Sequence, residues 1–132
     1  MSEENVEIVR RGWEAFDRGD LSAAMEDMSP DIETYVAPPA PVTGTYHGIE
    51  GWVQSMLDWA EGFDELVMTA EEYFDAGDQV VVRSRHTSRG AASGVPVEAI
   101  FWYVWTIRAG KIVRVAVFSD WSEALEAAGL SE

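Results

Sequence analysis

One segment, Val97–Ile107, constrains the fold more than any other part of the sequence. Its residues alternate as in a β-strand, yet large apolar side chains occur on both of its faces. One face carries Phe101, Tyr103 and Trp105, and the other carries Ile100, Trp102 and Val104. An antiparallel sheet in a monomer usually has one face in water, so this strand needs a cover on each side. We expect helices of the chain to cover one face and a second subunit to cover the other, centred on Ile100, Trp102 and Val104.

Helical patterns come first in the chain and extended patterns follow. The spacing of apolar residues predicts a helix up to about Gly19, a short helix over Leu21–Met28 and a third helix that begins at His47. A strand over Asp31–Val36 separates the second helix from the third. The later strands are expected over residues 66–74, 79–89, 97–107 and 112–119, before a last helix over residues 121–128. This order is typical of one α+β domain that spans residues 1–132.

Composition excludes several classes of partner. The formal net charge is −15, from 24 acidic and 9 basic residues, so the surface repels nucleic acid and anionic lipid. The chain has no cysteine, which excludes disulfides, thiolate metal sites and a cysteine nucleophile. The N-terminus is acidic and is not followed by an apolar run, so we expect no signal peptide there. No stretch has the ~18 apolar residues of a membrane span, and we expect a cytoplasmic protein.

Six stretches of the sequence carry a family resemblance. They are NVEIVRR (5–11), FDRGDL (16–21), SPDIE (29–33), YHGIEG (46–51), VWTIRAGKIVR (104–114) and EALEAAGL (123–130). Together they resemble SnoaL-like proteins of the nuclear-transport-factor-2-like superfamily. The resemblance implies a cone-shaped, curved antiparallel sheet wrapped around N-terminal helices, with a short C-terminal helix. It also implies an open conical pocket and homodimers formed through the sheet.

The resemblance implies different chemistries in different branches, which include ketosteroid isomerases, polyketide cyclases, dehydratases and limonene-type epoxide hydrolases. The functional tyrosine and two acids of ketosteroid isomerases would fall on Gly12, on Val36 and near Tyr103, so that acid–base set is missing. The Asp-Arg-Asp set of limonene epoxide hydrolases would fall on Ser84, His86 and Asp120. The arginine of that set is absent, and a histidine and an aspartate remain as candidate catalytic residues.

His86 and Asp120 each have a second interpretation. His86 is in phase with Val80 and Val82, which predicts an inward side chain that is either a pocket acid/base or a core histidine satisfied by a neighbour. Asp120 precedes the last helix and, with Glu123, forms a box-like N-cap. The two histidines of the chain, His47 and His86, have no acid at ligand spacing, so no metal site is expected.

Aromatic residues and methionines are abundant and leucine is scarce, whereas an ordinary core is filled mainly with Leu, Ile and Val. The large flat side chains predict a pocket for a small, flat, apolar molecule. The expected pocket residues on the helices are Trp13, Trp52, Met56 and Trp59. Those on the strands are Tyr35, Ser84, Phe101, Tyr103 and Trp105. The inward direction of Tyr35 stays open. Alternation places Tyr35 on the same strand face as Glu33, and this face points to water if Ile32 packs in the core.

These residues support a cofactor-free enzyme that acts on a small apolar substrate by general acid–base chemistry. A hydrolase, cyclase, dehydratase or isomerase reaction would fit. A non-catalytic small-molecule binder and an engineered scaffold of this fold remain alternatives. The proline-containing loop Ala37–Tyr46 is expected to form part of the pocket mouth.

Overall fold

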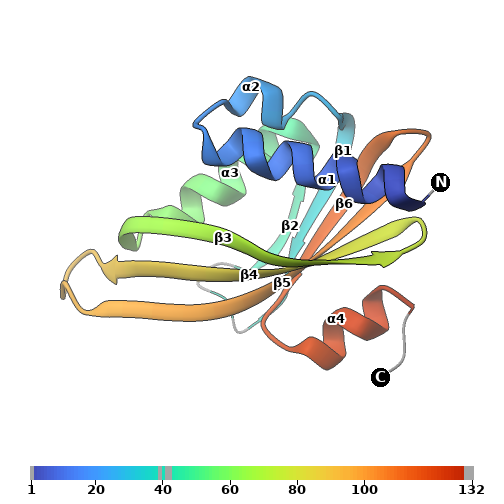
Figure 1. The fold of residues 1–132 in the computed structure, drawn as a ribbon. Helices are drawn as coiled ribbons and strands as arrows, with labels where there is room; N and C mark the ends of the chain where they lie inside the picture. The colour runs from blue at the N-terminus through green and yellow to red at the C-terminus, as the bar shows by residue number, and fades with distance from the viewer. Residues whose placement is uncertain (1, 39, 41–42, 130–132) are drawn as a thin grey trace.

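The fold is described from a computed structural model, which covers residues 2–38, 40 and 43–129. Its helices are α1 (Ser2–Asp17), α2 (Leu21–Ala24), α3 (Gly48–Ala60) and α4 (Trp121–Ala127). Its strands are β1 (Met28–Val36), β2 (Gly44–His47), β3 (Phe63–Ala76), β4 (Gln79–Gly90), β5 (Pro96–Arg108) and β6 (Lys111–Phe118). The strands form one sheet in the order β2-β1-β6-β5-β4-β3. The predicted α+β class and the curved sheet with its N-terminal helices and short C-terminal helix are confirmed (Figure 1).

The sheet is antiparallel except for one pair. Strands β3 to β6 form the expected meander, each antiparallel to its neighbour. Strand β1 then lies parallel to β6 and antiparallel to β2. The curved antiparallel sheet expected from the sequence thus includes one parallel pair, β1 with β6.

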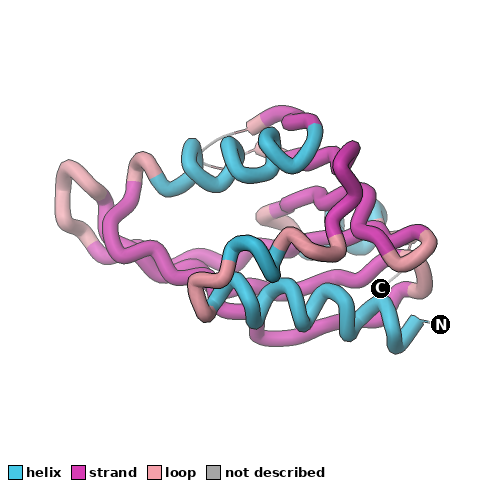
Figure 2. Tube along the Cα trace, turned by 90° about the horizontal axis from the view of Figure 1, so that it is seen from above, coloured by secondary structure: helices cyan, strands magenta, loops and turns pink. Residues whose placement is uncertain are grey.

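The helices divide between the two faces of the sheet. Helices α1, α2 and α3 lie over one face, called the inner face below, and α4 lies against the opposite, outer face (Figure 1). Seen from above, α3 runs along one side of the inner face, and α1 with α2 along the other (Figure 2). The core beneath them includes Ile32, Val80 and Val82, each with no exposed surface.

The outer face is covered in part by the chain itself. Val104 is buried in a cluster with Val81 and Ala116, against Ala124 and Ala128 at α4. The sequence analysis expected a second subunit to cover Val104, and α4 covers it instead. Asp120 begins α4, since its carboxylate accepts hydrogen bonds from the backbone N–H groups of Ser122 and Glu123 at 2.7 and 3.3 Å. Such a cap stabilises a helix by about 1 kcal/mol.

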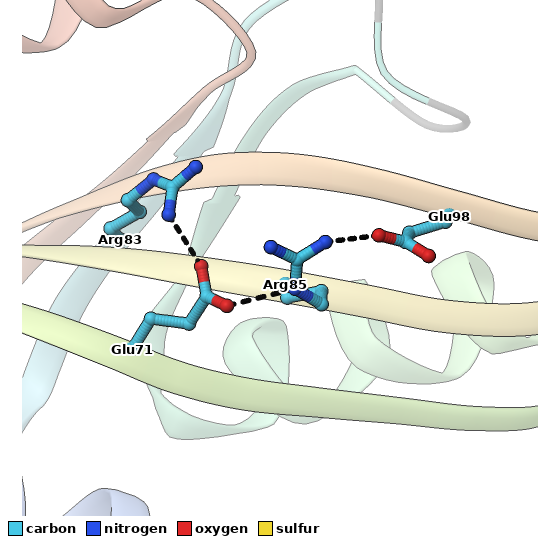
Figure 3. Close-up of polar contacts among 4 residues, drawn as sticks. All are labelled: Glu71, Arg83, Arg85 and Glu98. Carbon is cyan, nitrogen blue, oxygen red and sulfur yellow. Dashed lines mark hydrogen bonds and ion pairs between the residues drawn. The ribbon is translucent and has the colours of Figure 1, made fainter.

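Beyond α4, ion pairs cover the outer face of β3, β4 and β5 (Figure 3). Glu71 accepts from Arg83 at 2.6 Å and from Arg85 at 2.8 Å. Arg85 also donates to Glu98. The guanidinium of Arg83 lies 5.6 Å from the ring centroid of Trp102, which packs against Trp121 with centroids 4.3 Å apart.

Several element boundaries differ from the sequence prediction, including β3, which spans Phe63–Ala76 rather than residues 66–74. The second helix ends at Ala24 rather than Met28, because Met28 is buried and already starts β1. The segment expected as an irregular loop contains β2, whose residues pair with Glu33–Val36 on β1. Within the described residues, no helix combines the length and apolarity needed to cross a membrane.

Candidate ligand site

A cavity of about 90 Å³ lies between α1, α3 and the inner face of the sheet. It is lined by six residues that the sequence analysis assigned to ligand binding, namely Trp13, Trp52, Met56, Trp59, Tyr103 and Trp105. The helical spacing of α1 and α3 turns the first four toward the sheet, and the alternation of β5 turns the last two toward the helices. Edge-to-face contacts hold the rings, for example Trp13 against Tyr103 with centroids 5.0 Å apart.

The lining of this cavity contains no charged side chain among the described residues. Its polar groups are Thr34, Ser55 and Tyr103, together with the indole N–H groups. Ser55 is satisfied within its helix, because its hydroxyl donates to the backbone oxygen of Trp52 at 2.6 Å. The indole of Trp13 donates to the backbone oxygen of Met68 at 3.2 Å. The cavity is therefore suited to an uncharged molecule with an apolar body.

A second cavity of about 310 Å³ adjoins the first, and Trp59 and Leu66 line both. His86 and Phe101 form part of its wall. Ala40, from the segment expected to form the pocket mouth, lines it too, whereas Pro39, Pro41 and Val42 lie outside the described residues. Ala37 of the same segment packs in the outer-face cluster, so the mouth hypothesis stays a prediction.

His86 is buried and oriented by a hydrogen bond to Tyr103. Its Nε2 lies 3.0 Å from the Tyr103 hydroxyl oxygen, and that hydroxyl lies 3.6 Å from Sδ of Met68. If Nε2 carries the proton and donates to Tyr103, the Tyr103 hydroxyl can donate to Met68, and each group has a partner. The other tautomer would place an N–H at Nδ1, which has no hydrogen-bond partner among the described residues. We infer the Nε2–H tautomer, which leaves the Nδ1 lone pair as an acceptor.

Burial shifts the proton affinities of this pair in opposite directions. It lowers the pKa of His86 from 6.5 to about 4, because the imidazolium would lose its hydration among Trp59 and Phe101. The same loss of hydration raises the pKa of the Tyr103 hydroxyl. Both groups are therefore neutral at pH 7.

Three predicted site residues line neither cavity. Tyr35 lies on the outer face, with its ring 6.3 Å from Phe118 and beneath Arg114. Ser84 is on the inner face but is fully enclosed. Asp120 is exposed and caps α4, so the structure does not bring it to His86. The count along the chain that paired Asp120 with His86 did not take into account that the chain leaves the sheet at Phe118 and turns toward the outer face.

Sequence reasoning missed several lining residues. Thr34 lines the first cavity, and Leu66 and Met68 from β3 line it as well. Thr34 had a usable signal, because it alternates with Ile32 on β1 and must share its face. Leu66 and Met68 had none, since β3 shifts register twice along its pairing with β4. The contact between His86 and Tyr103 required the register of β4 and β5, in which Tyr103 pairs with Val82.

Comparison with known proteins identifies the family to which this fold belongs. The sequence model of the SnoaL-like domain matches residues 9–115. The chain belongs to the SnoaL-like domain family. Among curated relatives, an uncharacterised protein of Mycobacterium tuberculosis is 26% identical over 115 residues, which cover 86% of this chain and 87% of that protein.

Solved structures of the same fold are similar over nearly the whole chain. An NTF2-like protein of Burkholderia thailandensis is 29% identical, with a TM-score of 0.80 over 96% of this chain and 97% of that one. A protein of Mesorhizobium loti, provisionally named a SnoaL-like polyketide cyclase, is 27% identical, with a TM-score of 0.69 over 85% of this chain and 96% of that one. The family accounts for the fold and does not by itself choose an activity.

The low pKa of His86 has a measurable consequence for stability. Between pH 6.5 and about 4 the unfolded chain binds a proton at this histidine and the folded chain does not. The free energy of unfolding therefore falls as pH drops through this window, by about 3 kcal/mol at most from His86 alone. We expect proton NMR to give a His86 titration midpoint near 4.

The chain offers a simple assignment control for this titration. Its only other histidine is His47, so the His47→Gln variant leaves a single imidazole signal, that of His86. The His86→Phe variant should lose the extra destabilisation between pH 6.5 and 4 in urea unfolding. A midpoint near 6.5 for His86 would contradict the buried, uncharged site described above.

Proposed function

We propose that the protein binds a small, flat, uncharged and largely apolar molecule in the cavity between α1, α3 and the inner face. The observation that carries this proposal is the lining of the cavity. Aromatic rings and methionines surround it, and none of the described lining residues is charged. An ordinary close-packed core leaves few voids larger than a water molecule. The provisional name of the Mesorhizobium relative, a polyketide cyclase, supports a small organic ligand.

Filling the cavity from α3 tests the proposal. The Met56→Trp substitution adds bulk to the cavity wall, and we expect it to weaken binding of naphthalene by about tenfold or more, since the ring and the ligand compete for one space. Binding is measured by ligand-observed NMR. Leu57→Trp is the matched control, because Leu57 is the next residue of α3 and its surface is 60% exposed. No detectable binding of naphthalene by the unmodified protein, or an equal loss in both variants, would refute the proposal.

A second candidate function is proton transfer by His86, and one observation favours it. Tyr103 holds Nε2, and Nδ1 is a buried atom without a described hydrogen-bond partner in a residue that lines the second cavity, so a substrate reaches Nδ1 only if the cavity wall moves. A neutral imidazole so oriented can accept a proton from a substrate or from water, as in a cofactor-free hydrolase, cyclase, dehydratase or isomerase. Asp120 has no part in this proposal, because its carboxylate caps α4.

Turnover separates this enzyme from a binder. A panel of uncharged epoxides, enones and hydroxy ketones is screened, and the reaction found is repeated with His86→Ala and His86→Asn. We expect His86→Ala to lower turnover by about 10²-fold, the usual scale of general acid–base catalysis. His86→Asn places an amide oxygen near the Nδ1 position, so it should retain ligand binding but not proton transfer. Equal turnover in the folded His86→Ala variant would remove His86 from the mechanism.

We also propose that two copies associate through the outer face beside α4. Four of the nine basic residues are Arg83, Arg85, Arg89 and Arg114, and each is ion-paired with a glutamate on this side of the sheet. The strip is thus close to neutral on a chain of net charge −15, so two copies repel least there. Ile100 and Trp102 supply half-buried apolar surface next to it.

Light scattering at micromolar concentration tests the dimer. The expected mass is twice the chain mass of 14.6 kDa, and Arg85→Glu should shift the mass toward 14.6 kDa by adding like charges to the strip. The control is Arg11→Glu, since Arg11 pairs with Asp27 at the other side of the molecule and should leave the mass unchanged. A mass of 14.6 kDa for the unmodified protein would contradict the proposal.

A further inference from the structure

The inner face of β5 runs along both cavities. Alternate residues of a strand point to the same face, so every second residue of β5 belongs to one inner row. From the first cavity to the second, this row consists of Trp105, Tyr103, Phe101, Ala99 and Val97. The first two line the first cavity and the last three line the second. The row extends over about 27 Å of strand, so the two cavities follow one another along β5.

The cavities meet at side chains from α3 and β3. Trp59 and Leu66 line both cavities. The indole of Trp59 packs against the rings of His86 and Phe101, with centroids 5.4 and 4.8 Å apart, and both of these rings line the second cavity. The hydrogen bond between His86 and Tyr103 joins the wall of the second cavity to the wall of the first. The two spaces are therefore neighbouring parts of one region of the inner face.

A bulge in β3 sets the position of Leu66 at this junction. The register of β3 against β4 shifts between Asp64 and Val67. The two residues within the shift, Glu65 and Leu66, together oppose Ser88 alone. Glu65 has φ of 55°, a conformation that costs free energy in a residue other than glycine. The fold thus retains a strained residue at the point where β3 sets the width of the junction.

The two ends of this region differ in their access to water. In the first cavity the lining from β6 is deeply buried, since Ile112, Val115 and Val117 are at most 4% exposed. At the far end of the second cavity, Val97 is 37% exposed. None of the described residues that line either cavity is Asp, Glu, Lys or Arg. The β6 end is therefore suited to apolar rings, whereas the Val97 end leaves an uncharged polar group in contact with water.

We infer that the two cavities form one elongated site, whose ligand is a flat apolar ring system that carries an uncharged chain. The ring system lies in the first cavity, the chain passes Trp59 and Leu66, and the end of the chain lies beside Ala99 and Val97. This inference rests on the proposed function, because it requires that the first cavity takes the rings. A compact molecule that fills the first cavity alone would leave the second cavity unused and would bind more weakly.

The test compares naphthalene with 6-(2-naphthyl)hexan-1-ol, in which the same rings carry an apolar chain with a hydroxyl end. The measured quantity is the ratio of their dissociation constants, obtained by ligand-observed NMR. In the unmodified protein we expect the longer probe to bind about tenfold more tightly or better, because its chain leaves water. Ala99→Phe adds a ring to the wall of the second cavity, and it should lower this advantage by about tenfold while naphthalene binds as before.

Thr87→Phe is the matched control for this substitution. Thr87 is exposed on β4 and alternates with His86, so its side chain points to the outer face. The variant adds the same ring outside the site and should leave both dissociation constants unchanged. A loss of the advantage in Thr87→Phe equal to that in Ala99→Phe would show that the loss does not come from filling the second cavity, and would overturn the inference.

A second readout needs no substitution in the site. In the complex with unmodified protein, nuclear Overhauser effects should connect the chain protons of the longer probe to the methyl groups of Val97. The ring protons should give such effects to the methyl group of Met56, which lines the first cavity only. If Ala99→Phe fails to fold, these contacts decide the question.

The outcomes separate this inference from the function on which it rests. An advantage of the longer probe that survives in folded Ala99→Phe, or a chain without contact to Val97, would overturn the elongated site and leave the binding function intact. An equal loss for both probes in Ala99→Phe would show that Ala99 bounds the space of the rings, and would overturn the elongated site as well. Absence of binding for both probes would overturn the binding function and, with it, the inference.

Discussion

The middle of the sheet is buried on both faces, and the two faces are covered in opposite ways. Val80, Val81 and Val82 are consecutive on β4 and none has exposed surface, although successive residues of a strand point to opposite sides. Under α4 the outer cluster includes the small residues Ala116, Ala124 and Ala128, which let the helix approach the sheet closely, while Trp121 packs beside them against Trp102. The inner cover consists of large rings, which hold α1 and α3 away from the sheet and leave space between them. The cavity therefore follows from the size of the side chains on one face.

The same division separates charge from apolar surface. The arginines of β4 alternate with Ser84 and His86, so their guanidinium groups reach the outer face, where Glu71 and Glu98 pair with them. Among the described residues no charged side chain lines the cavities beside His86, and the imidazole is neutral because burial lowers its pKa. A low-polarity cavity strengthens any hydrogen bond made inside it, since water does not compete there. An uncharged ligand can exploit this, whereas an ion would lose its hydration without compensation.

Sequence periodicity was sufficient to predict most of the fold and the direction of many side chains. The alternation of β5 predicted that Phe101, Tyr103 and Trp105 share a face, because no register shift interrupts its pairing with β4. The same rule places the side chains of Tyr35 and Ile32 on opposite faces of β1, and the outward position of Tyr35 follows from it. Asp120 shows where such reasoning fails, because a count along the chain cannot tell on which side of the sheet the last helix begins. The contact between His86 and Tyr103 could not be predicted either, because it depends on the pairing register of β4 with β5 and on the length of the two side chains.

Buried polar groups without a described hydrogen-bond partner are concentrated on the inner face of the sheet. Four of the five such atoms belong to Thr34, Ser84, His86 and Trp105, all on that face, and the fifth, Nε of Arg10, lies 3.7 Å from a carboxylate oxygen of Glu7. Each unsatisfied group costs about 1–3 kcal/mol, a large share of the usual stability of a small domain. The outer cluster around Val104 and α4 consists of apolar and aromatic side chains and includes no such described atom. An imbalance of this kind is typical of proteins that give up stability where a ligand supplies the missing contacts.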